Sequence, residues 1–300
     1  MRMKKFFVTA LALTIFSVSG YTSEEIPQYK NFSNVTVKPA RVVEEIKLPL
    51  QEEKYIVADN NFSNLQLTEI DKPVYDKYSI KERDARGLTT YLPEIAPYSE
   101  ENIAYLTFDD GPDDKVTPQI LDILKRENVK ATFFVLGNMV EQNPKVLKRI
   151  FDEGHAIGNH SYNHVYSELY KSPYDFVDQM MKTDEIIKNV TGVRPLIIRA
   201  PGGAAGVFND DYWAMLDSCG YVEYDWNACT QDATASAPNA ATQIDNVKKQ
   251  IGDYPPKALI VLMHSKAGKE ETAKALPQLI NMLRSYGYKF GVVTPMTPQY

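Results

Sequence analysis

Ile103-Ala104-Tyr105-Leu106-Thr107-Phe108-Asp109-Asp110-Gly111-Pro112 is the stretch around which the rest of the sequence can be organised. Its apolar first half predicts a buried strand, and Gly111-Pro112 cannot continue one. Two adjacent carboxylates at the end of a buried strand are costly unless a metal ion, a cationic side chain or a proton compensates their charge. One carboxylate can hold a metal while the other stays free for proton transfer. Alone, Asp-Asp-Gly is more typical of a solvated turn, so its interpretation depends on residues downstream.

Length and composition set the class of protein. Three hundred residues suggest one large domain or two smaller ones. A hydrophobic content of 44% and a charged content of 24% are ordinary for a soluble globular protein. The net charge of −6, without a block of Lys and Arg, argues against a nucleic-acid partner and against retention on an anionic membrane.

Residues 1–20 have the pattern of a secretory signal peptide. Arg2, Lys4 and Lys5 form a basic start, an apolar run covers Phe6–Val18, and small residues suited to cleavage follow. The apolar run is short for a membrane span. We therefore expect a secreted, extracytoplasmic protein that works at the cell wall and has no stable membrane span after cleavage. An uncleaved N-terminal membrane anchor is the alternative.

The two cysteines of the mature chain are Cys219 and Cys229. Export would permit a disulfide between them. A strand predicted over 222–226 would place them at its opposite ends, too far apart to bond, so free thiols are favoured.

Residues 21–100 differ from the rest of the chain. They are rich in Glu, Lys, Asn, Pro and Tyr, and only short alternating runs, such as Val35-Thr36-Val37 and Leu65-Gln66-Leu67, suggest strands. We interpret this part as a spacer, or N-terminal extension, with a few strands that pack on the following domain. Two prolines in Tyr91–Tyr98 favour an extended linker there. The main domain is accordingly predicted over 101–300.

From residue 102 onward, short apolar runs alternate with amphipathic helical patterns. The predicted strands are 103–108, 131–136, 155–158, 196–199, 221–227, 258–263 and 289–293. Seven strands that alternate with helices imply an α/β fold with a parallel sheet. A distorted (β/α)7 barrel fits this length, and an open doubly wound sheet is the alternative. Helix starts are predicted at Thr117, as a capping residue, and at Asn143, Ser172, Asn209 and Asn239.

Unusual polar residues follow five of these strands at the same end. They are Asp109 and Asp110, then His160 and His164, then Arg199, Asp232 and His264. In both candidate architectures the carboxyl ends of the strands carry the active site. The spacing of His160 and His164 would place both imidazoles on one face if the segment were helical. One further carboxylate, from Asp109 or Asp110, would complete a three-ligand metal site. His155 begins a strand, away from this end, and is interpreted as structural.

Four motifs together resemble a known family. In order and spacing, Thr107-Phe-Asp-Asp-Gly111, His160-Ser-Tyr-Asn-His164, Arg199-Ala-Pro-Gly-Gly203 and Leu262-Met-His264 are similar to the motifs of the polysaccharide deacetylases. These form the NodB-homology family, or carbohydrate esterase family 4. The resemblance covers about residues 102–295. It implies a distorted β/α barrel and metal-dependent removal of N- or O-acetyl groups from glycans.

The resemblance also implies roles for the polar residues. Asp110, His160 and His164 would bind the metal, and Asp109 would be the general base. Arg199 would hold Asp109 ionised, and His264 would be the general acid, kept charged by Asp232. The Gly202 N–H would stabilise the oxyanion, and Leu262 would contact the acetyl methyl group. Leu262 is equally well explained as a buried strand residue.

The sequence departs from the family pattern at two places. Gly202 stands where the family often has a bulky aromatic residue, which makes one wall of the substrate groove smaller. Ala233 follows Asp232, where the family commonly has Asp followed by Trp, so the assignment of Asp232 is weaker.

The predicted function is that of a secreted, metal-dependent deacetylase acting on N-acetylglucosamine polymers, with peptidoglycan as the preferred substrate. Chitooligosaccharides, O-acetylated xylan and a non-catalytic wall-glycan-binding role are the alternatives. A His2Asp site suits Zn²⁺, with Co²⁺, Ni²⁺ or Mn²⁺ as alternatives. We expect a monomer whose partner is an acetylated glycan.

Overall fold

The computed structural model describes residues 54–65, 70–93 and 101–299. They belong to one compact unit, Leu50–Tyr300. The predicted signal peptide, the 35–37 run and most of the predicted linker lie outside the described residues. Among the helices described, none combines the length and the apolar character needed to cross a membrane.

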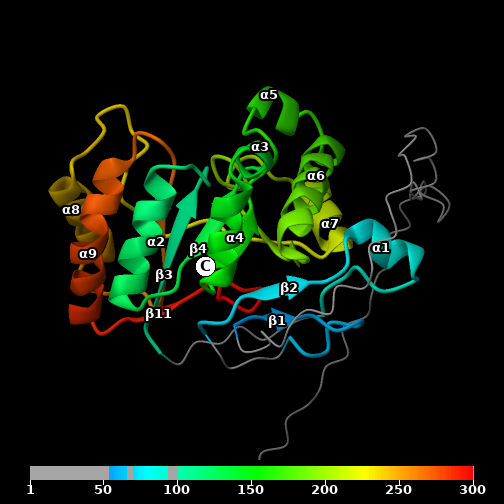
Figure 1. Ribbon diagram of the computed structural model, residues 1–300, viewed down its shortest axis with the longest axis horizontal. Helices are drawn as coiled ribbons and strands as arrows, with labels where there is room; N and C mark the ends of the chain where they lie inside the picture. The colour runs from blue at the N-terminus through cyan, green and yellow to red at the C-terminus, as the bar shows by residue number, and fades with distance from the viewer. Residues whose placement is uncertain (1–53, 66–69, 94–100, 300) are drawn as a thin grey trace, which may run out of the picture. The chain divides into compact units, whose positions relative to one another are not determined.

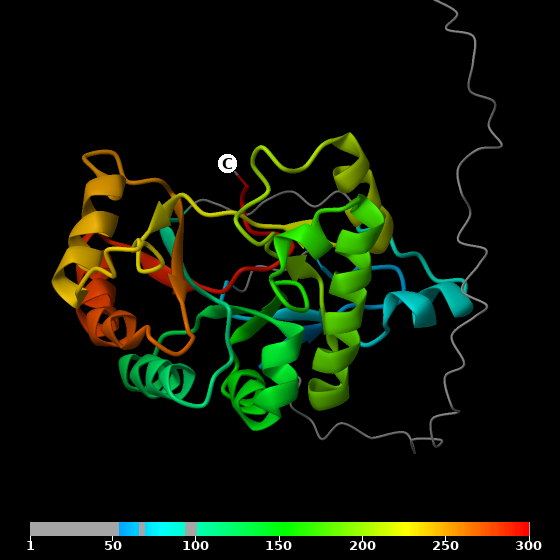
Figure 2. The same ribbon diagram turned by 90° about the horizontal axis from the view of Figure 1, so that it is seen from above.

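An eight-stranded parallel sheet forms the centre of this unit. Its order is β8-β7-β5-β4-β3-β10-β9, with β11 paired to β3. Figure 2, viewed from above, shows the helices standing outside the strands. The strands are β3 (Ile103–Asp109), β4 (Thr132–Val135), β5 (Ala156–Asn159), β7 (Ile197–Ile198), β8 (Val222–Glu223), β9 (Ala228–Cys229), β10 (Ala258–His264) and β11 (Lys289–Gly291).

The sheet curls because one chain segment connects its two edges. β8 pairs with β7 at one edge, β9 pairs with β10 at the other, and residues 224–227 alone separate them. The Tyr224 N–H donates to Ile198, whereas the Asn227 N–H donates to Ile260. The single strand predicted over 221–227 is therefore wrong, because this segment leaves one edge and joins the other. Counted as one broken strand, β8 and β9 complete the predicted seven, and the distorted β/α barrel is confirmed.

The last strand enters the middle of the sheet. β11 pairs with the first half of β3, where Lys289 lies opposite Ile103, and β4 pairs with the second half of the same side. Beyond β11, the Val293 N–H donates to the Thr132 hydroxyl on β4. The long strand β3 is thus held on both sides along its length, which fixes the direction in which Asp109 and Asp110 leave the sheet.

Helices cover the strands and bury the main hydrophobic core against them. The core includes Leu106 and Phe108 of β3 together with Leu121 and Leu276 from the helices. Figure 1 shows α2, α4 and α9 beside the strands. The helices are α2 (Val116–Glu127), α3 (Gly137–Gln142), α4 (Pro144–Asp152), α5 (Tyr166–Leu169), α6 (Pro173–Thr191), α7 (Asp210–Cys219), α8 (Ala240–Ile251) and α9 (Glu270–Ser285).

Predicted helix starts are confirmed at Ser172, Asn209 and Asn239, whose side chains accept hydrogen bonds from the first turns of α6, α7 and α8. The predicted cap at Thr117 is wrong. Asp113 Oδ1 accepts the N–H groups of Val116 and Thr117 instead, because its carboxylate lies before the first turn. The Thr117 hydroxyl is turned to the Ser265 carbonyl and ties α2 to the end of β10.

A small three-stranded sheet packs at the opposite end of the barrel. It pairs β1 (Ile56–Val57) with β2 (Val74–Asp76), and β2 with β6 (Arg194–Pro195), beside helix α1 (Ile80–Ala85). Figure 1 shows β1 and β2 below the barrel helices. The Tyr75 hydroxyl donates to the His155 carbonyl and accepts from the Ile157 N–H, which joins β2 to the start of β5.

His155 has a structural environment. It is buried, its Nδ1 accepts a hydrogen bond from the Ala131 N–H, and burial together with Lys130 and Arg149 lowers its pKa to about 3. A neutral imidazole at the amino end of β5 is consistent with its interpretation as structural. Cys219 and Cys229 are both free thiols.

Candidate metal centre and active site

Asp109 and Asp110 leave β3 with different surroundings. Asp109 is the last residue of the strand, and Asp110 begins the turn with φ at 71°. This left-handed conformation is uncommon for a residue other than glycine, although Asp tolerates it better than most. Such strain persists only where the surrounding structure enforces it, and it concentrates at functional sites. Both carboxylates are buried.

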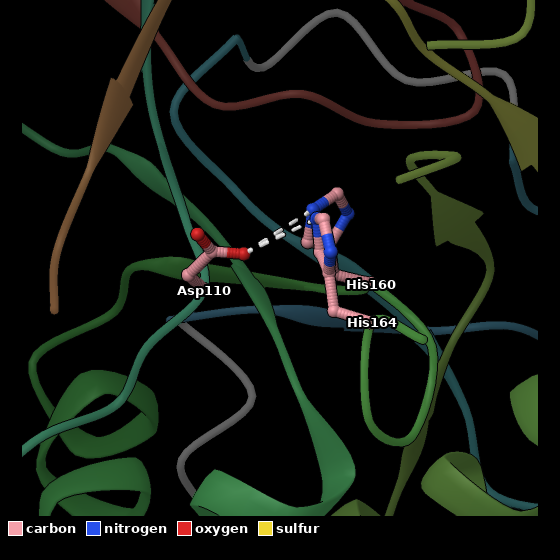
Figure 3. Close-up of side chains that lie close together, drawn as sticks. All are labelled: Asp110, His160 and His164. Atoms are coloured by element: carbon pink, nitrogen blue, oxygen red, sulfur yellow. Dashed lines mark ion pairs between the residues drawn. The ribbon is translucent and has the colours of Figure 1, made fainter. Parts of the chain in front are cut away.

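One oxygen of Asp110 faces two imidazoles. Asp110 Oδ1 lies 3.6 Å from His160 Nε2 and 3.7 Å from His164 Nε2 (Figure 3). One ligand atom from each of the three residues falls within 4.8 Å of the others. For comparison, ligand atoms about 2.1 Å from a tetrahedral Zn²⁺ are about 3.4 Å apart. The three side chains therefore converge at a spacing that suits one metal ion.

The two histidines converge through a loop rather than a helix. Residues 160–164 have no helical turn, and Ser161 and His164 both have positive φ, at 75° and 60°. The segment is therefore not helical, and the two imidazoles come together by a different route from the shared helix face that the spacing would give. Asn159 Oδ1 accepts the Ser161 N–H, and the Ser161 hydroxyl accepts the His164 N–H. These bonds fold the loop so that both Nε2 atoms reach Asp110.

The chemistry of the donor set fits a cation. His160 Nδ1 donates to the Arg199 carbonyl at 2.8 Å, which leaves Nε2 as the atom with the free lone pair. Burial lowers the pKa of His160 despite its neighbouring carboxylates, which favours the neutral ring that binds a metal. Asp110 Oδ1 is buried and has no hydrogen-bond partner among the described residues. An unpaired buried oxygen directed at two imidazoles is the arrangement expected of a metal ligand set.

Asp110 is also held ionised. Burial raises its pKa, but His160, Lys266 and His264 outweigh this effect and lower the pKa to about 2. Lys266 Nζ lies 2.6 Å from Asp110 Oδ2, the oxygen that does not face the imidazoles. Sequence reasoning missed Lys266. Its position two residues after His264, in a loop at the same end of the sheet, was the only available signal.

Asp109 belongs to a separate pair. Arg199 Nη1 contacts Asp109 Oδ1 at 3.0 Å and also donates to the Thr107 hydroxyl. The other guanidinium nitrogens donate to the carbonyls of Tyr224 and Asp225, so the buried Arg199 is fixed in place. Asp109 Oδ2 lies 3.7 Å from His160 Nε2. One oxygen of Asp109 is thus held by the arginine, and the other faces the candidate metal site.

His264 and Asp232 form the second pair. Asp232 Oδ1 lies 2.8 Å from His264 Nδ1, and Oδ2 accepts from the His264 N–H and the Thr272 hydroxyl. Burial lowers the pKa of His264, but the hydrogen bond and charge of Asp232 outweigh it and raise the pKa above its ordinary value. His264 Nε2 lies 3.9 Å from Asp110 Oδ2 and so faces the same site.

The remaining predicted residues lie on the elements that carry these pairs. Gly202 follows Arg199 in a turn with φ at 82°, which favours glycine. Leu262 lies two residues before His264 on β10, opposite Thr107 in the parallel register, and is 9% exposed. The structure therefore brings Asp109, Asp110, His160, His164, Arg199, Asp232 and His264 into one contact network, with Gly202 and Leu262 on adjoining backbone.

Fold and site together define a parallel β/α-barrel protein with a candidate mononuclear metal site at the carboxyl ends of its strands. A family profile described as polysaccharide deacetylase matches residues 97–224. This range contains Asp109, Asp110, His160, His164, Arg199 and Gly202 and ends before Asp232 and His264.

Comparison with individual relatives establishes the family of the protein. The chain is 38% identical over 203 residues to a peptidoglycan-N-acetylglucosamine deacetylase of Bacillus cereus. The matched region covers 67% of this chain and 70% of the relative. A solved catalytic domain of a peptidoglycan N-acetylglucosamine deacetylase from Eubacterium rectale superposes with a TM-score of 0.62 at 31% identity. It covers 69% of this chain and 95% of that structure. The protein belongs to the polysaccharide deacetylase family, carbohydrate esterase family 4.

The family also contains inactive members. A pseudoenzyme of carbohydrate esterase family 4 from Bacillus anthracis has a TM-score of 0.57 at 30% identity and covers 66% of each chain. Membership alone therefore does not establish activity, which must be argued from the residues of this site.

Proposed function

We propose that this protein is a metal-dependent polysaccharide deacetylase that hydrolyses the N-acetyl groups of N-acetylglucosamine polymers, with peptidoglycan as its substrate. The observation that carries the proposal is the convergence of His160 and His164 on the unpaired, buried Oδ1 atom of Asp110. Asp109, the last residue of β3, and His264, the last residue of β10, flank this group. A deacetylase needs a base and an acid beside a Lewis acid, and the pairs Asp109–Arg199 and His264–Asp232 supply both.

Asp110, His160 and His164 would hold the metal. A divalent cation there would polarise the acetamide carbonyl and make a bound water more acidic. Zn²⁺ suits two imidazoles and one carboxylate, and Co²⁺, Ni²⁺ or Mn²⁺ are alternatives that metal analysis would separate.

The protein side chains would move the protons. Asp109, held in place by Arg199, accepts a proton from the attacking water as the water oxygen bonds to the acetamide carbon. The Gly202 N–H stabilises the developing oxyanion, and Leu262 contacts the acetyl methyl group. His264, charged beside Asp232, gives its proton to the nitrogen as the carbon–nitrogen bond breaks. The products are acetate and a free glucosamine amine.

The preference for peptidoglycan rests on the relatives named above and on the signal-like residues 1–20. We propose a secreted, monomeric protein that acts in the cell wall. Chitooligosaccharides and O-acetylated xylan present the same acetyl chemistry and are alternative substrates. The Bacillus anthracis relative makes a non-catalytic glycan-binding protein the competing class of function.

The test is acetate release from peptidoglycan, N-acetylated chitooligosaccharide and acetylxylan, each with and without a chelator. Mass spectrometry then identifies the deacetylated sugar position. We expect release from peptidoglycan that the chelator abolishes and added metal restores. Metal-restored release from another glycan alone would change the substrate, and no release from any glycan would contradict the enzyme.

A further inference from the structure

The turn after Arg199 lacks a side chain where the family often has a bulky one. Gly202 occupies that position, with φ at 82°. A Cβ atom placed on Gly202 would nevertheless meet another residue at once. It would lie 2.5 Å from the Tyr166 hydroxyl oxygen and 3.2 Å from Tyr166 Cζ, well inside van der Waals contact. The space beside Gly202 is therefore filled by an aromatic ring from a different part of the chain.

Tyr166 begins α5, two residues after the candidate metal ligand His164. The ring centroids of His164 and Tyr166 are 5.3 Å apart, and those of Tyr166 and Tyr170 are 5.7 Å apart in an edge-on arrangement. Tyr170 is anchored in turn, since its hydroxyl donates to the Pro201 carbonyl at 2.6 Å. These contacts fix the Tyr166 ring between a candidate metal ligand and the predicted oxyanion turn.

The ring is fixed but not buried. Tyr166 remains 51% exposed. In the part of the chain that the structure describes, no residue hydrogen-bonds to its hydroxyl, whereas the hydroxyls of Tyr162 and Tyr170 both have acceptors. An oriented aromatic face with a free hydroxyl at the edge of a site is suited to a ligand with one apolar face and several hydroxyls. A pyranose ring has this character.

We propose that Tyr166 is a substrate-contacting residue that replaces, from α5, the groove wall that Gly202 lacks. Its ring packs against the sugar that bears the acetamide, and its hydroxyl exchanges a hydrogen bond with that sugar. This inference rests on the proposed function, because the sugar is its substrate. Gly202 and Tyr166 form a coupled pair, since a side chain at 202 and the present position of the Tyr166 ring exclude each other.

The test compares Tyr166→Ala and Tyr166→Phe with Tyr174→Ala, a similarly exposed tyrosine (53%) on α6. N-acetylated chitooligosaccharide is the substrate, and kcat, KM and bound metal are measured for each variant. Loss of the ring should raise KM about tenfold, and loss of the hydroxyl alone about threefold. Bound metal and kcat should stay close to those of the wild type, and Tyr174→Ala should change neither constant.

Three results would overturn the inference. The first is a KM for Tyr166→Ala equal to that of Tyr174→Ala. The second is a loss of bound metal from Tyr166→Ala, and the third is a fall in its kcat without a change in KM. The second and third would mean that the ring only supports His164. A calorimetric titration of the same oligosaccharide into each variant separates this inference from the proposed function. If the wild type binds the sugar but releases no acetate from it or from peptidoglycan, the proposed function fails, and the affinity of Tyr166→Ala still decides the role of Tyr166.

Discussion

Two groups of acidic and basic residues lie at opposite ends of the barrel; they are built from similar side chains, and all of their members except His164 are buried. The amino-end cluster consists of Asp76, Arg83, Asp184 and Arg194. The carboxyl-end cluster consists of Asp109, Asp110, Arg199, His160 and His164. Each places acids and arginine within a nearly solvent-free interior. They differ in whether the polar atoms have partners within the protein.

In the amino-end cluster the polar atoms satisfy one another. Arg83 contacts both oxygens of Asp76, at 2.5 and 3.1 Å, and donates further to three backbone carbonyls. Arg194 reaches Asp76 and Asp184, and Asp184 also accepts from Tyr221 and Asn159. A buried ion pair completed in this way holds segments together, and removing one partner is costly.

The carboxyl-end cluster leaves ligand atoms free. Asp110 Oδ1 has no hydrogen-bond partner among the described residues, and the Nε2 atoms of His160 and His164 converge on it. Because a buried polar atom without a partner is unfavourable, such an atom indicates a missing ligand. The comparison teaches that burial and charge do not identify a functional site. An unpaired buried oxygen indicates one where other ligand atoms converge on it, as at Asp110, and not by itself, since Asp113 Oδ2 is also buried without a partner among the described residues.

The two clusters are connected. The Asn159 amide donates to Asp184 of the amino-end cluster, and its oxygen accepts the Ser161 N–H in the loop between the two histidines. The N-terminal part of the described chain thereby supports the metal-site loop through Asp76, Arg194 and Asp184. Support of this kind should affect stability more than chemistry.

The largest effect is expected from His264→Gln. It removes the predicted general acid, so kcat should fall about 10²- to 10⁴-fold, while the free energy of unfolding should fall by about 1–3 kcal/mol, because Asp232 loses its charged partner. Initial rates of acetate release and urea unfolding measure the two quantities. A large loss of stability with little loss of rate would place His264 with the structural residues.

Arg83→Met should show the reverse pattern. It leaves Asp76 facing Arg194 alone in a buried site, so unfolding should become easier by about 3–5 kcal/mol. The rate per folded molecule should hardly change. Arg86→Met, on the exposed surface beside Tyr78, is the matched control and should cost about 1 kcal/mol or less. Equal effects of the two substitutions would mean that the amino-end cluster contributes little.

Asp232→Asn should give a smaller effect that depends on pH. The Asp232 carboxylate raises the pKa of His264, and His264 must be protonated to act, so activity falls as pH rises through that pKa. The neutral amide should lower this pKa and shift the alkaline limb of the kcat/KM profile downward by about one pH unit. The profile at lower pH should change less. An unshifted limb would separate Asp232 from the proton donor.

The barrel could be predicted from the sequence because apolar strands alternate regularly with capped helices. The break in the fifth strand could not be predicted, because the side chain of Asn227 makes hydrogen bonds to β10 that the backbone of a strand would otherwise make. It donates to the Ala258 carbonyl and accepts the Ile260 N–H. The hydrophobic periodicity of the sequence gives no sign of these side-chain hydrogen bonds.

The candidate site was predictable once the barrel was, because the carboxyl ends of parallel strands meet. The contacts of Lys266 and Tyr166 were not, because they depend on where loops distant in sequence come together. The Asp76–Arg194 contact likewise joins residues that no local pattern connects.

The central claim is that Asp110 binds the metal while Asp109 acts as the base. Its most direct test measures bound metal and acetate release in Asp109→Asn and Asp110→Asn side by side. We expect Asp109→Asn to retain one equivalent of metal and lose turnover, and Asp110→Asn to lose both. Metal retained by Asp110→Asn but lost from Asp109→Asn would contradict the assignment.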